Sequence, residues 1–400
     1  MNLHLLLLMF GTFATGTNAL IMTGILPIVA DGLDTTPAIA GLSVTVFALA
    51  YALSAPLLPV LLARFERRTI MVISLIALVL GTLASIAAQD ITTFLITRAI
   101  VGFGSAAFTP QASAVAVGMV PPERRGRAIT MVLLGITAAS AIGVPIGTVV
   151  GNAWGYRAAL LVVAALGVLA IVGILFVPKT PKPVNPGFAA QLAPLRRPAV
   201  LAVAGTTALV TTGFFAISIY FAPLLFSTAG LDSSALAVVL AAFGVAGIAS
   251  LLFGGRYIDR FGGFRITAVS LVVITIGTPM FGVATNLWWI LLLVVPWGVF
   301  GSIIIPAQQY ELGRLDPDNP APVFALNSSA IYAGTALGGL VGSVSMSVAP
   351  VQWHVVVAAV PLLLALLATL AQLARARRGV RPAEFATASA SAPELAPVAD

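Results

Sequence analysis

The sequence predicts an all-α polytopic membrane protein with twelve transmembrane helices in two pseudo-symmetric six-helix bundles. Two observations come from composition: 60% of the 400 residues are hydrophobic and only 8% are charged, whereas a soluble domain carries about 25% charged residues. The third is an internal repeat, described below. So few charges cannot supply the polar surface of a soluble fold this long, which excludes a cytosolic enzyme.

Each predicted span is a run of about 20 mostly apolar residues, the length that a helix needs to cross a bilayer core of about 30 Å. The runs are continuously apolar, which favours helices over the alternating strands of a membrane barrel. The first run lacks a basic leading segment and eleven more follow, so we interpret it as a retained helix and not as a signal peptide. The spans are 3–29, 37–62, 69–89, 91–119, 125–152, 156–177, 200–226, 234–257, 265–285, 287–313, 321–348 and 351–373.

The basic residues predict how the spans are oriented. Of the 20 Lys and Arg residues, 18 fall at one end of the spans, and Arg157 is the single basic residue at the opposite end. The positive-inside rule places the eighteen, and both termini, in the cytoplasm. The net charge of +7 is then a cytoplasmic collar and not a nucleic-acid-binding patch. We expect a multi-pass protein of the cytoplasmic (inner) membrane, surrounded by lipids, with no nucleic-acid partner.

The chain divides into two halves and two polar segments. An N-terminal six-helix bundle covers 1–177 and a C-terminal one covers 199–373. The linker 178–198 is rich in proline and basic residues and has no apolar run. The tail 374–400 is rich in Ala, Ser, Pro and Glu, a composition that predicts a disordered cytoplasmic segment.

The two halves repeat one another. The loop of residues 59–68, between spans 2 and 3, corresponds to residues 255–265, between spans 8 and 9. Glycines and prolines inside the spans recur at nearly the same spacing: Gly102 with Gly298, Pro110 with Pro306, Gly143 with Gly338, and Gly147 with Gly342. Several matches in one order indicate a duplicated six-helix unit, the organisation of many secondary transporters with a site at the midplane.

Three motifs resemble those of a known family. They are Gly255-x-x-x-Asp259-Arg260-x-Gly262 between spans 8 and 9, Arg98-x-x-x-Gly102 in span 4, and Gly143-Val-Pro145-Ile-Gly147 in span 5, followed by Gly151 and Trp154-Gly155-Tyr156-Arg157. They are similar to the loop signature, the second motif and the antiporter motif of the major facilitator superfamily, in its twelve-span drug:proton antiporter branch (DHA1-like). Chloramphenicol and sugar efflux members are similar. The resemblance implies the major facilitator fold, a small-molecule substrate and protons as the coupling ion.

The loop between spans 8 and 9 must turn tightly. Gly255 and Gly262 allow close backbone approach, Asp259 can cap a neighbouring helix, and Arg260 can hold the turn at the lipid headgroups. Such a cluster could latch one conformation, although a plain cytoplasmic turn explains the arginines equally well. In the first half Ala63 replaces the acidic residue, so a latch there would depend on Arg64, Glu66, Arg67 and Arg68.

Spans 5 and 11 each carry three glycines at four-residue spacing, which places them on one helix face for close packing. Pro145 should bend span 5, because proline removes a backbone hydrogen bond. Static packing and an interface that slides during transport both fit Gly143, Pro145 and Gly147.

Arg98 is the one charge deep in a predicted span, about 10 Å from its outer end at 1.5 Å per residue. A buried arginine is costly without a partner or a cavity; Asn18, backbone carbonyls and an electronegative substrate group are the alternatives. The resemblance implies a glutamate in span 1 within Gly-Thr-x-Glu, but here the residues are Gly16-Thr17-Asn18-Ala19. No Asp or Glu lies deep in any predicted span, which weakens the expectation of proton coupling.

The resemblance places spans 1, 4, 7 and 10 around a cavity. Their non-aliphatic residues together predict an aromatic, largely apolar cavity suited to a neutral amphipathic molecule, although for each residue alone lipid contact or packing is the favoured interpretation. The candidates are Asn18, Met22, Arg98, Phe108, Gln111, Thr211, Thr212, Phe214, Phe215, Tyr220, Trp297 and Gln308. His4 and His354 lie near span ends and are expected to be interfacial residues in preference to proton relays.

Enzyme and cofactor sites find no support in the sequence. It contains no cysteine, no P-loop and no His/Asp/Glu cluster with metal-ligand spacing, so no cofactor is expected. We predict a monomeric exporter of small, largely apolar compounds. The alternatives are a sugar or nucleoside efflux carrier, an uncoupled uptake facilitator, and a non-transporting membrane sensor or scaffold.

Overall fold

The computed structural model describes residues 3–121, 125–179, 187, 189, 193–315, 320–348 and 350–377. This part of the chain is helical without strands, and it contains 12 helical spans long and apolar enough to cross a membrane. The predicted all-α, twelve-span architecture is confirmed. Most of the predicted linker, and the tail beyond residue 377, lie outside the described residues.

The first half contains six spans, three of which are interrupted. Its elements are α1 (Leu3–Leu20) continued by α2 (Met22–Gly32), α3 (Pro37–Leu61), α4 (Arg67–Ala87), α5 (Ile91–Ser105) continued by α6 (Phe108–Gly118), α7 (Arg125–Ala138) continued by the π-helix η2 (Ala139–Gly143) and α8 (Val144–Trp154), and α9 (Tyr156–Leu175).

The second half contains six more spans, and all but one are continuous. A short 3₁₀ helix, η3 (Ala193–Arg196), precedes them. The elements are α11 (Pro198–Ile219) continued by α12 (Phe221–Ala229), α13 (Ser233–Phe261), α14 (Gly263–Met280) followed by the 3₁₀ turn η4 (Phe281–Val283), α15 (Leu287–Leu315), α16 (Pro320–Val348) and α17 (Val351–Arg377).

Prolines explain two of the interruptions in the first half. A proline ring clashes with the carbonyl four residues earlier and leaves that carbonyl without its helical donor. Pro110 places the clash at Ala106, which lies between α5 and α6. Pro145 places it at Ala141, inside η2. The bend predicted at Pro145 therefore takes the form of a five-residue π-helix.

The interruption of the seventh span follows the same rule. Pro223 places the clash at Ile219, the last residue of α11, and Tyr220 joins α11 to α12 with φ −101° and ψ 18°. Tyr220 is fully buried, as is Ile21 between α1 and α2. A bilayer core offers no hydrogen-bond partners to irregular backbone, so these joints have to lie inside the protein.

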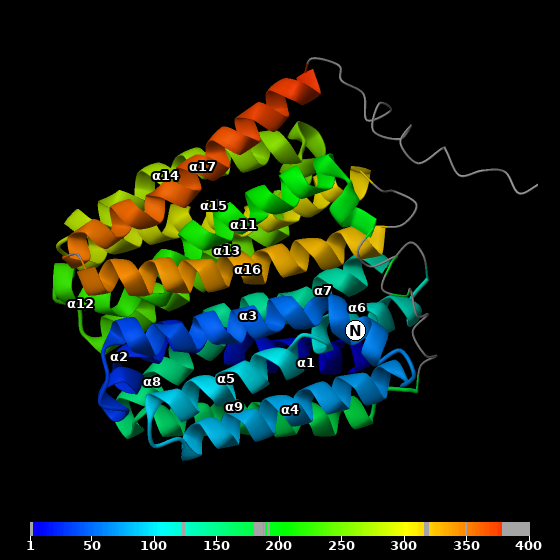
Figure 1. Cartoon of the computed structure of the whole chain (residues 1–400), viewed down its shortest axis with the longest axis horizontal. Coiled ribbons are helices and arrows are strands. Elements are labelled where there is room, and N and C mark those ends of the chain that lie inside the picture. Colours follow the sequence, from blue (N-terminus) through cyan, green and yellow to red (C-terminus); the bar gives the residue numbers. More distant parts are fainter. Residues whose placement is uncertain are drawn as a thin grey trace, which may run out of the picture.

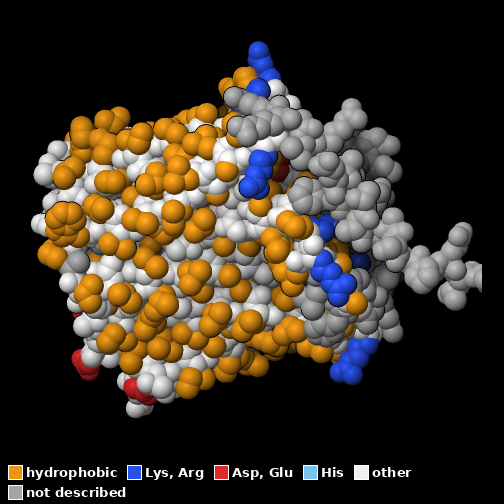
Figure 2. All heavy atoms as spheres, turned by 45° about the horizontal axis from the view of Figure 1, so that its top comes forward, with side chains coloured by type: hydrophobic (Ala, Val, Ile, Leu, Met, Phe, Trp, Pro, Cys, Tyr) orange, Lys and Arg blue, Asp and Glu red, His pale blue; other side chains and the backbone are white. Residues whose placement is uncertain are grey.

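The charged side chains separate the molecule into two ends and an apolar belt (Figure 2). We call the end that carries Arg64, Arg67, Arg256, Arg260 and Arg314 the basic end. We call the end that carries Asp31, Asp34, Asp90 and Asp232 the acidic end. The described chain begins and finishes at the basic end (Figure 1).

Helix capping explains why carboxylates gather at the acidic end. The even-numbered spans begin there, so their unpaired N–H groups point outward. Asp90 accepts a hydrogen bond from the Thr93 N–H at 2.9 Å, and Asp232 accepts one from the Ala235 N–H at 2.8 Å. Backbone and hydroxyl hydrogen bonds from Thr93 hold the pKa of the Asp90 carboxyl below its usual value.

Glycines pack the spans within each half. A methyl group added to Gly143, Gly147 or Gly151 would meet span 1, and one added to Gly334, Gly338 or Gly342 would meet α11. Span 5 therefore packs on span 1 as span 11 packs on span 7, which is the relation expected of a duplicated unit. In this conformation the predicted glycine stripes serve packing inside each half.

The two halves meet along three contacts. α3 and α16 lie side by side between the halves (Figure 1), with the rings of Tyr51 and Tyr332 stacked at 3.5 Å between centroids. We call this pair of helices the seam. α13 packs on η2 and α8, where Gly244 rests on the backbone of Ala141. α2 contacts α12 at the acidic end, which is closed in this conformation.

Gly244→Ala tests the second contact between the halves. The added methyl would overlap the backbone of Ala141, which cannot rotate away as a side chain can. We expect a loss of about 1–3 kcal/mol from overpacking, measured as a lower thermal unfolding temperature in detergent. Gly277→Ala in α14, where an added methyl meets nothing within 4 Å, is the matched control. Equal unfolding temperatures for the two variants would contradict this packing.

Candidate functional site

Arg98 is the centre of a buried polar network in the first half. Its side chain is fully buried, and its guanidinium donates to the Asn18 side-chain oxygen at 2.8 Å and to the Asn18 carbonyl at 3.2 Å. The guanidinium carbon also lies 4.9 Å from the centre of the Phe47 ring. Asn18 and a backbone carbonyl, two of the predicted alternatives, therefore act together as partners of Arg98.

Asn18 extends this network to a third span. Its amide donates to the Thr82 hydroxyl at 2.8 Å, and that hydroxyl donates to the Leu78 carbonyl at 2.7 Å. The network thus joins spans 1, 3 and 4, and Phe47 adds span 2. Arg98 is a brace inside the first bundle, held by an amide where the resemblance implied a nearby carboxylate.

Glu311 organises the basic end of the second half. It is nearly buried on α15, and one carboxylate oxygen accepts from the N–H groups of Gly263 at 2.8 Å and Phe264 at 3.2 Å. These are the first residues of α14, so the carboxylate stabilises the helix N-terminus. The prediction gave this capping role to Asp259, which is exposed; the correct residue is Glu311, brought there by tertiary packing.

In the first half, a neutral acceptor ties the fourth span to the start of the third span. Arg67 begins α4, as Gly263 begins α14, and its guanidinium donates to the side-chain oxygen of Gln111 on α6 at 3.0 Å. Gln111 was predicted to contact the substrate. In this conformation Gln111 instead ties the fourth span to the first residue of the third span.

The remaining loop-motif residues lie on the surface of the basic end. Gly262 has a φ of +83° and joins α13 to α14, so the turn requires glycine. Arg260 lies over the Phe261 ring at 5.3 Å, and Arg64 lies over the Phe65 ring at 4.8 Å. Gly255 is exposed with nothing within 4 Å of an added methyl, Glu66 precedes α4 without a side-chain cap, and Arg68 is half-buried.

Trp297 lies in an aromatic cluster inside the second bundle. Its ring stacks on Phe214 at 4.2 Å between centroids with a 5° interplanar angle, and Phe221, Phe243 and Phe281 lie within 6.3 Å. The indole N–H donates to the Thr278 hydroxyl at 3.2 Å. Trp297 is therefore a core residue whose polar group is satisfied.

Most other predicted cavity residues also pack within a bundle. Phe108 contacts Gly11 of α1, and Met22 belongs to the core around α2. Thr211 and Thr212 donate to carbonyls of their own helix. Phe214 and Phe215 are half-exposed, so they are the members of the predicted set with free apolar surface.

Two buried amides make no hydrogen bond. Gln308 on α15 and Asn327 on α16 are both fully buried, and neither the oxygen nor the nitrogen of either side chain has a partner among the described residues. Gln308 lies seven residues before the end of α15 and Asn327 seven residues after the start of α16. Both are thus about 10 Å from the basic ends of their helices. We call them the amide pair.

Both members of the amide pair face α11. Gln308 lies two turns from Gly301, which packs on Phe214 of α11, and Asn327 lies two turns from Gly334, which packs on Ala208 of α11. Seven residues return nearly to the same helix face, which places each amide on the side of its helix that is turned toward α11. Gln308 was predicted as a site residue. Asn327 was missed because span 11 was not counted among the cavity-lining spans.

Tyr220 bridges the two halves at the acidic end. Its hydroxyl lies 3.0 Å from the Gly339 carbonyl on α16 and 3.3 Å from the Ala38 carbonyl in the first turn of α3. Tyr220 was predicted to line the cavity. It instead belongs to the contact that closes the acidic end.

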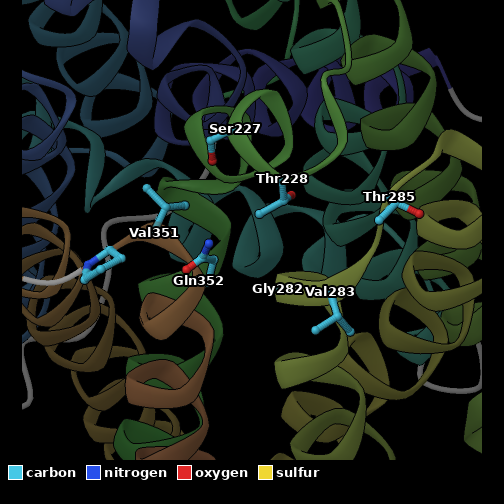
Figure 3. A pocket seen from close by; sticks show the side chains of 8 residues that line it. Ser227, Thr228, Gly282, Val283, Thr285, Val351 and Gln352 are labelled. Atoms are coloured by element: carbon cyan, nitrogen blue, oxygen red, sulfur yellow. The ribbon is translucent and has the colours of Figure 1, made fainter.

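A pocket of about 220 Å³ opens at the acidic end of the second half (Figure 3). Ser227 and Thr228 at the end of α12 form one wall, and Val351 and Gln352 at the start of α17 form another. The loop after α14 completes it with Gly282, Val283 and Thr285. The pocket carries no charged residue among those that line it. The sequence gave no signal for it, because its walls come from three segments far apart in the chain.

Comparison with a family model places these features in context. The model described as Major Facilitator Superfamily matches residues 8–318 and, separately, residues 203–397. Two similar proteins are the uncharacterized MFS-type transporter YtbD of Bacillus subtilis (strain 168) and the inner membrane transport protein YdhP of Escherichia coli (strain K12). YtbD is 30% identical over 352 residues, 85% of this chain and 87% of YtbD. YdhP is 30% identical over 349 residues, 86% of this chain and 89% of YdhP.

Solved structures of the same fold are more distant in sequence. The human organic anion transporter MFSD10 (TETRAN) superposes with a TM-score of 0.71 at 14% identity, over 92% of this chain and 99% of that one. A point mutant of the nucleoside transporter NupG superposes with a TM-score of 0.72 at 13% identity, over 92% and 99% of the two chains. At these identities the likeness shows the fold alone.

Asn18→Ala should destabilise the first bundle. It removes the acceptor of one guanidinium hydrogen bond from Arg98 and the link to Thr82, and hydrogen bonds to charged groups contribute about 1.5–3 kcal/mol. Asn152→Ala is the matched control, since that exposed amide bonds only the Thr148 carbonyl of its own helix. Thermal unfolding in detergent compares them, and an Asn18 variant as stable as the control would refute the bracing role.

Glu311→Ala should expose the first amides of α14 to exchange. The lost acceptor leaves two N–H groups without a hydrogen bond at a buried helix N-terminus. Each such group destabilises the folded state by about 1–3 kcal/mol. Glu311→Gln keeps one side-chain oxygen and should recover part of the loss. Hydrogen exchange at Gly263 and Phe264 measures both variants. Unchanged exchange in Glu311→Ala would show that another group caps α14.

Proposed function

Because this chain belongs to the major facilitator superfamily, and is therefore a secondary transporter, we propose that it exports small, largely apolar compounds by alternating access. It is a multi-pass membrane protein. We place its basic end in the cytoplasm, following the positive-inside rule. Each chain contains both halves of the repeat, so a monomer has a complete pathway.

The amide pair carries the proposal about the substrate. A buried polar group without a partner costs about 1–3 kcal/mol, and Gln308 and Asn327 contribute four such atoms. A compound that satisfies them would recover that free energy when the basic end opens. Each amide can donate and accept, so the favoured substrate is mostly apolar and carries a few neutral donors and acceptors.

The contacts between the halves support alternating access. The acidic end is closed by α2 against α12 and by the Tyr220 bridge, whereas the seam of α3 and α16 runs through the middle of the molecule. Opening the acidic end would break the first two contacts and leave the seam as the pivot. An exported compound would enter from the basic end. Its release therefore requires the acidic end to open.

Proton exchange is the driving force that we propose from the family resemblance. Among the described residues no carboxylate lies deep in a span: Glu311 lies four residues before the end of α15 and is engaged as a cap. The proton would therefore bind a group other than a buried acid. An uncoupled facilitator remains the rival mechanism.

Transport assays decide between these functions. A drug-sensitive bacterial host expressing the chain should gain tolerance to some members of a panel of apolar antibiotics and dyes. Inverted vesicles should accumulate those compounds faster with an imposed pH gradient. Accumulation indifferent to the gradient would establish a facilitator, and transport confined to sugars or nucleosides would establish that alternative. A correctly inserted chain that moves nothing would favour a sensor or scaffold.

Gln308→Ala and Asn327→Ala should each raise the KM for transport. Losing one neutral hydrogen bond to the substrate, about 0.5–1.5 kcal/mol, corresponds to roughly a 2- to 13-fold rise in KM. Gln372→Ala is the control, because that amide donates to the Ala202 carbonyl and the Thr206 hydroxyl inside the bundle. Wild-type KM values in both amide-pair variants would exclude them from the substrate site.

A further inference from the structure

A histidine is buried near the acidic end of the second half. His354 lies in the first turn of α17 and is fully buried. One ring nitrogen, Nδ1, is hydrogen-bonded with the Ser345 hydroxyl of α16, and the other, Nε2, has no hydrogen-bond partner within 3.5 Å among the described residues. It lies at a span end, where the sequence placed it, but the protein buries its side chain completely.

On the described elements that pack chiefly against α17, no charged group lies near this imidazole. α17 packs chiefly against α11, α12, α14, α16 and η4. The charged residues of these elements and of α17 itself all lie at the basic end: Arg265, Arg375 and Arg377. Apart from His354, the other titratable residues are two tyrosines, Tyr220 and Tyr332. Tyr332 lies at the seam against Tyr51. Tyr220 is thus the one titratable neighbour, and no carboxylate is available to balance a charged imidazole.

Tyr220 connects His354 to the closed acidic end. The two rings meet edge to face, with centroids 5.6 Å apart and an interplanar angle of 78°. The Tyr220 hydroxyl in turn bridges to Ala38 in the other half. The imidazole therefore packs against the side chain that holds the halves together at this end.

Water can come within one helical turn of His354. Val351 and Gln352 line the pocket of about 220 Å³ (Figure 3). Val355 contacts Gly282, which lies on another wall of the pocket. A water molecule occupies about 30 Å³ of liquid, so the pocket has room for several. The barrier between this water and the imidazole is one turn of α17 and its neighbours.

We propose that His354 is a proton-binding site that controls the closed acidic end. Neutral His354 suits the present packing, whereas a protonated imidazole has no counter-charge here and needs water. Water reaches it when α12 and α17 move away from α2 and α3. Since coupling is reciprocal, a proton taken up from the acidic end favours the open conformation. This inference rests on the proposed function in one respect, that the opening releases the exported compound.

A single engineered thiol can report this opening, because the chain contains no cysteine. Ala38→Cys places a thiol at the buried contact with Tyr220, and Ser234→Cys places one at an exposed position of the same end. A membrane-impermeant maleimide is added at the acidic end, between about pH 5 and pH 8 where histidine titrates. The labelling rate at position 38 divided by that at position 234 removes the effect of thiol ionisation.

The ratio should rise several-fold as the pH falls, and His354→Gln should abolish that rise. Glutamine keeps a polar group for Ser345 but does not take up a proton. Tyr220→Phe is the second variant: it keeps the ring, removes the bridge, and should give a high ratio at every pH. A pH dependence that persists in His354→Gln, or a parent ratio that does not change with pH, overturns the proposal. If His354→Gln does not insert into the membrane, the Tyr220→Phe variant decides. A labelling ratio that is as low as the parent's and changes with pH in the same way overturns the proposal.

The labelling assay needs no substrate, so the two proposals can fail separately. A pH-dependent ratio in a chain that transports nothing would refute the exporter and keep the His354 site. Transport with a ratio indifferent to pH would refute the His354 site and keep the exporter.

Discussion

The absence of hydrogen-bond partners in a bilayer core is the constraint on which the rest of this structure depends. It requires the spans to be helices and forces their breaks, at Ile21 and Tyr220, into the protein interior. It also decides where polar chemistry can survive. Charges move to the two ends, where carboxylates cap helices, and the one deep charge, Arg98, is held by both oxygens of Asn18. Among the buried polar groups that lack a partner in the described part of the chain, the amide pair and Nε2 of His354 belong to the side chains on which the proposals rest.

The fold could be predicted from sequence because hydropathy reports depth directly. Runs of apolar residues gave the number of spans, and arginine placement distinguished the two ends. Repeated glycines and prolines also indicated the duplicated unit. The structure shows this unit in two equivalent contacts, span 5 on span 1 and span 11 on span 7. Joints within a span were harder to predict, since Pro110 interrupts its span while Pro296 and Pro306 lie within the continuous α15.

The candidate site could be predicted only in part, because depth along a span does not give the direction in which a side chain points. Trp297 and Phe108 lie at suitable depths but face the interiors of their bundles. The Arg98–Asn18 contact was foreseeable, since both residues lie at similar depth and a buried arginine demands a partner. Glu311 and Asn327 acquire their roles from neighbouring helices that no local pattern reveals.

Pro110 and Pro306 occupy matching positions in the repeat, yet one copy is jointed and the other is a single rod. The fourth span is divided between α5 and α6, whereas α15 runs without interruption from Leu287 to Leu315. After duplication, the two copies have therefore diverged in stiffness as well as in sequence. Rotation about the seam would then differ between the two copies. The fourth span could bend near Ala106, whereas the tenth span would move as a rigid body.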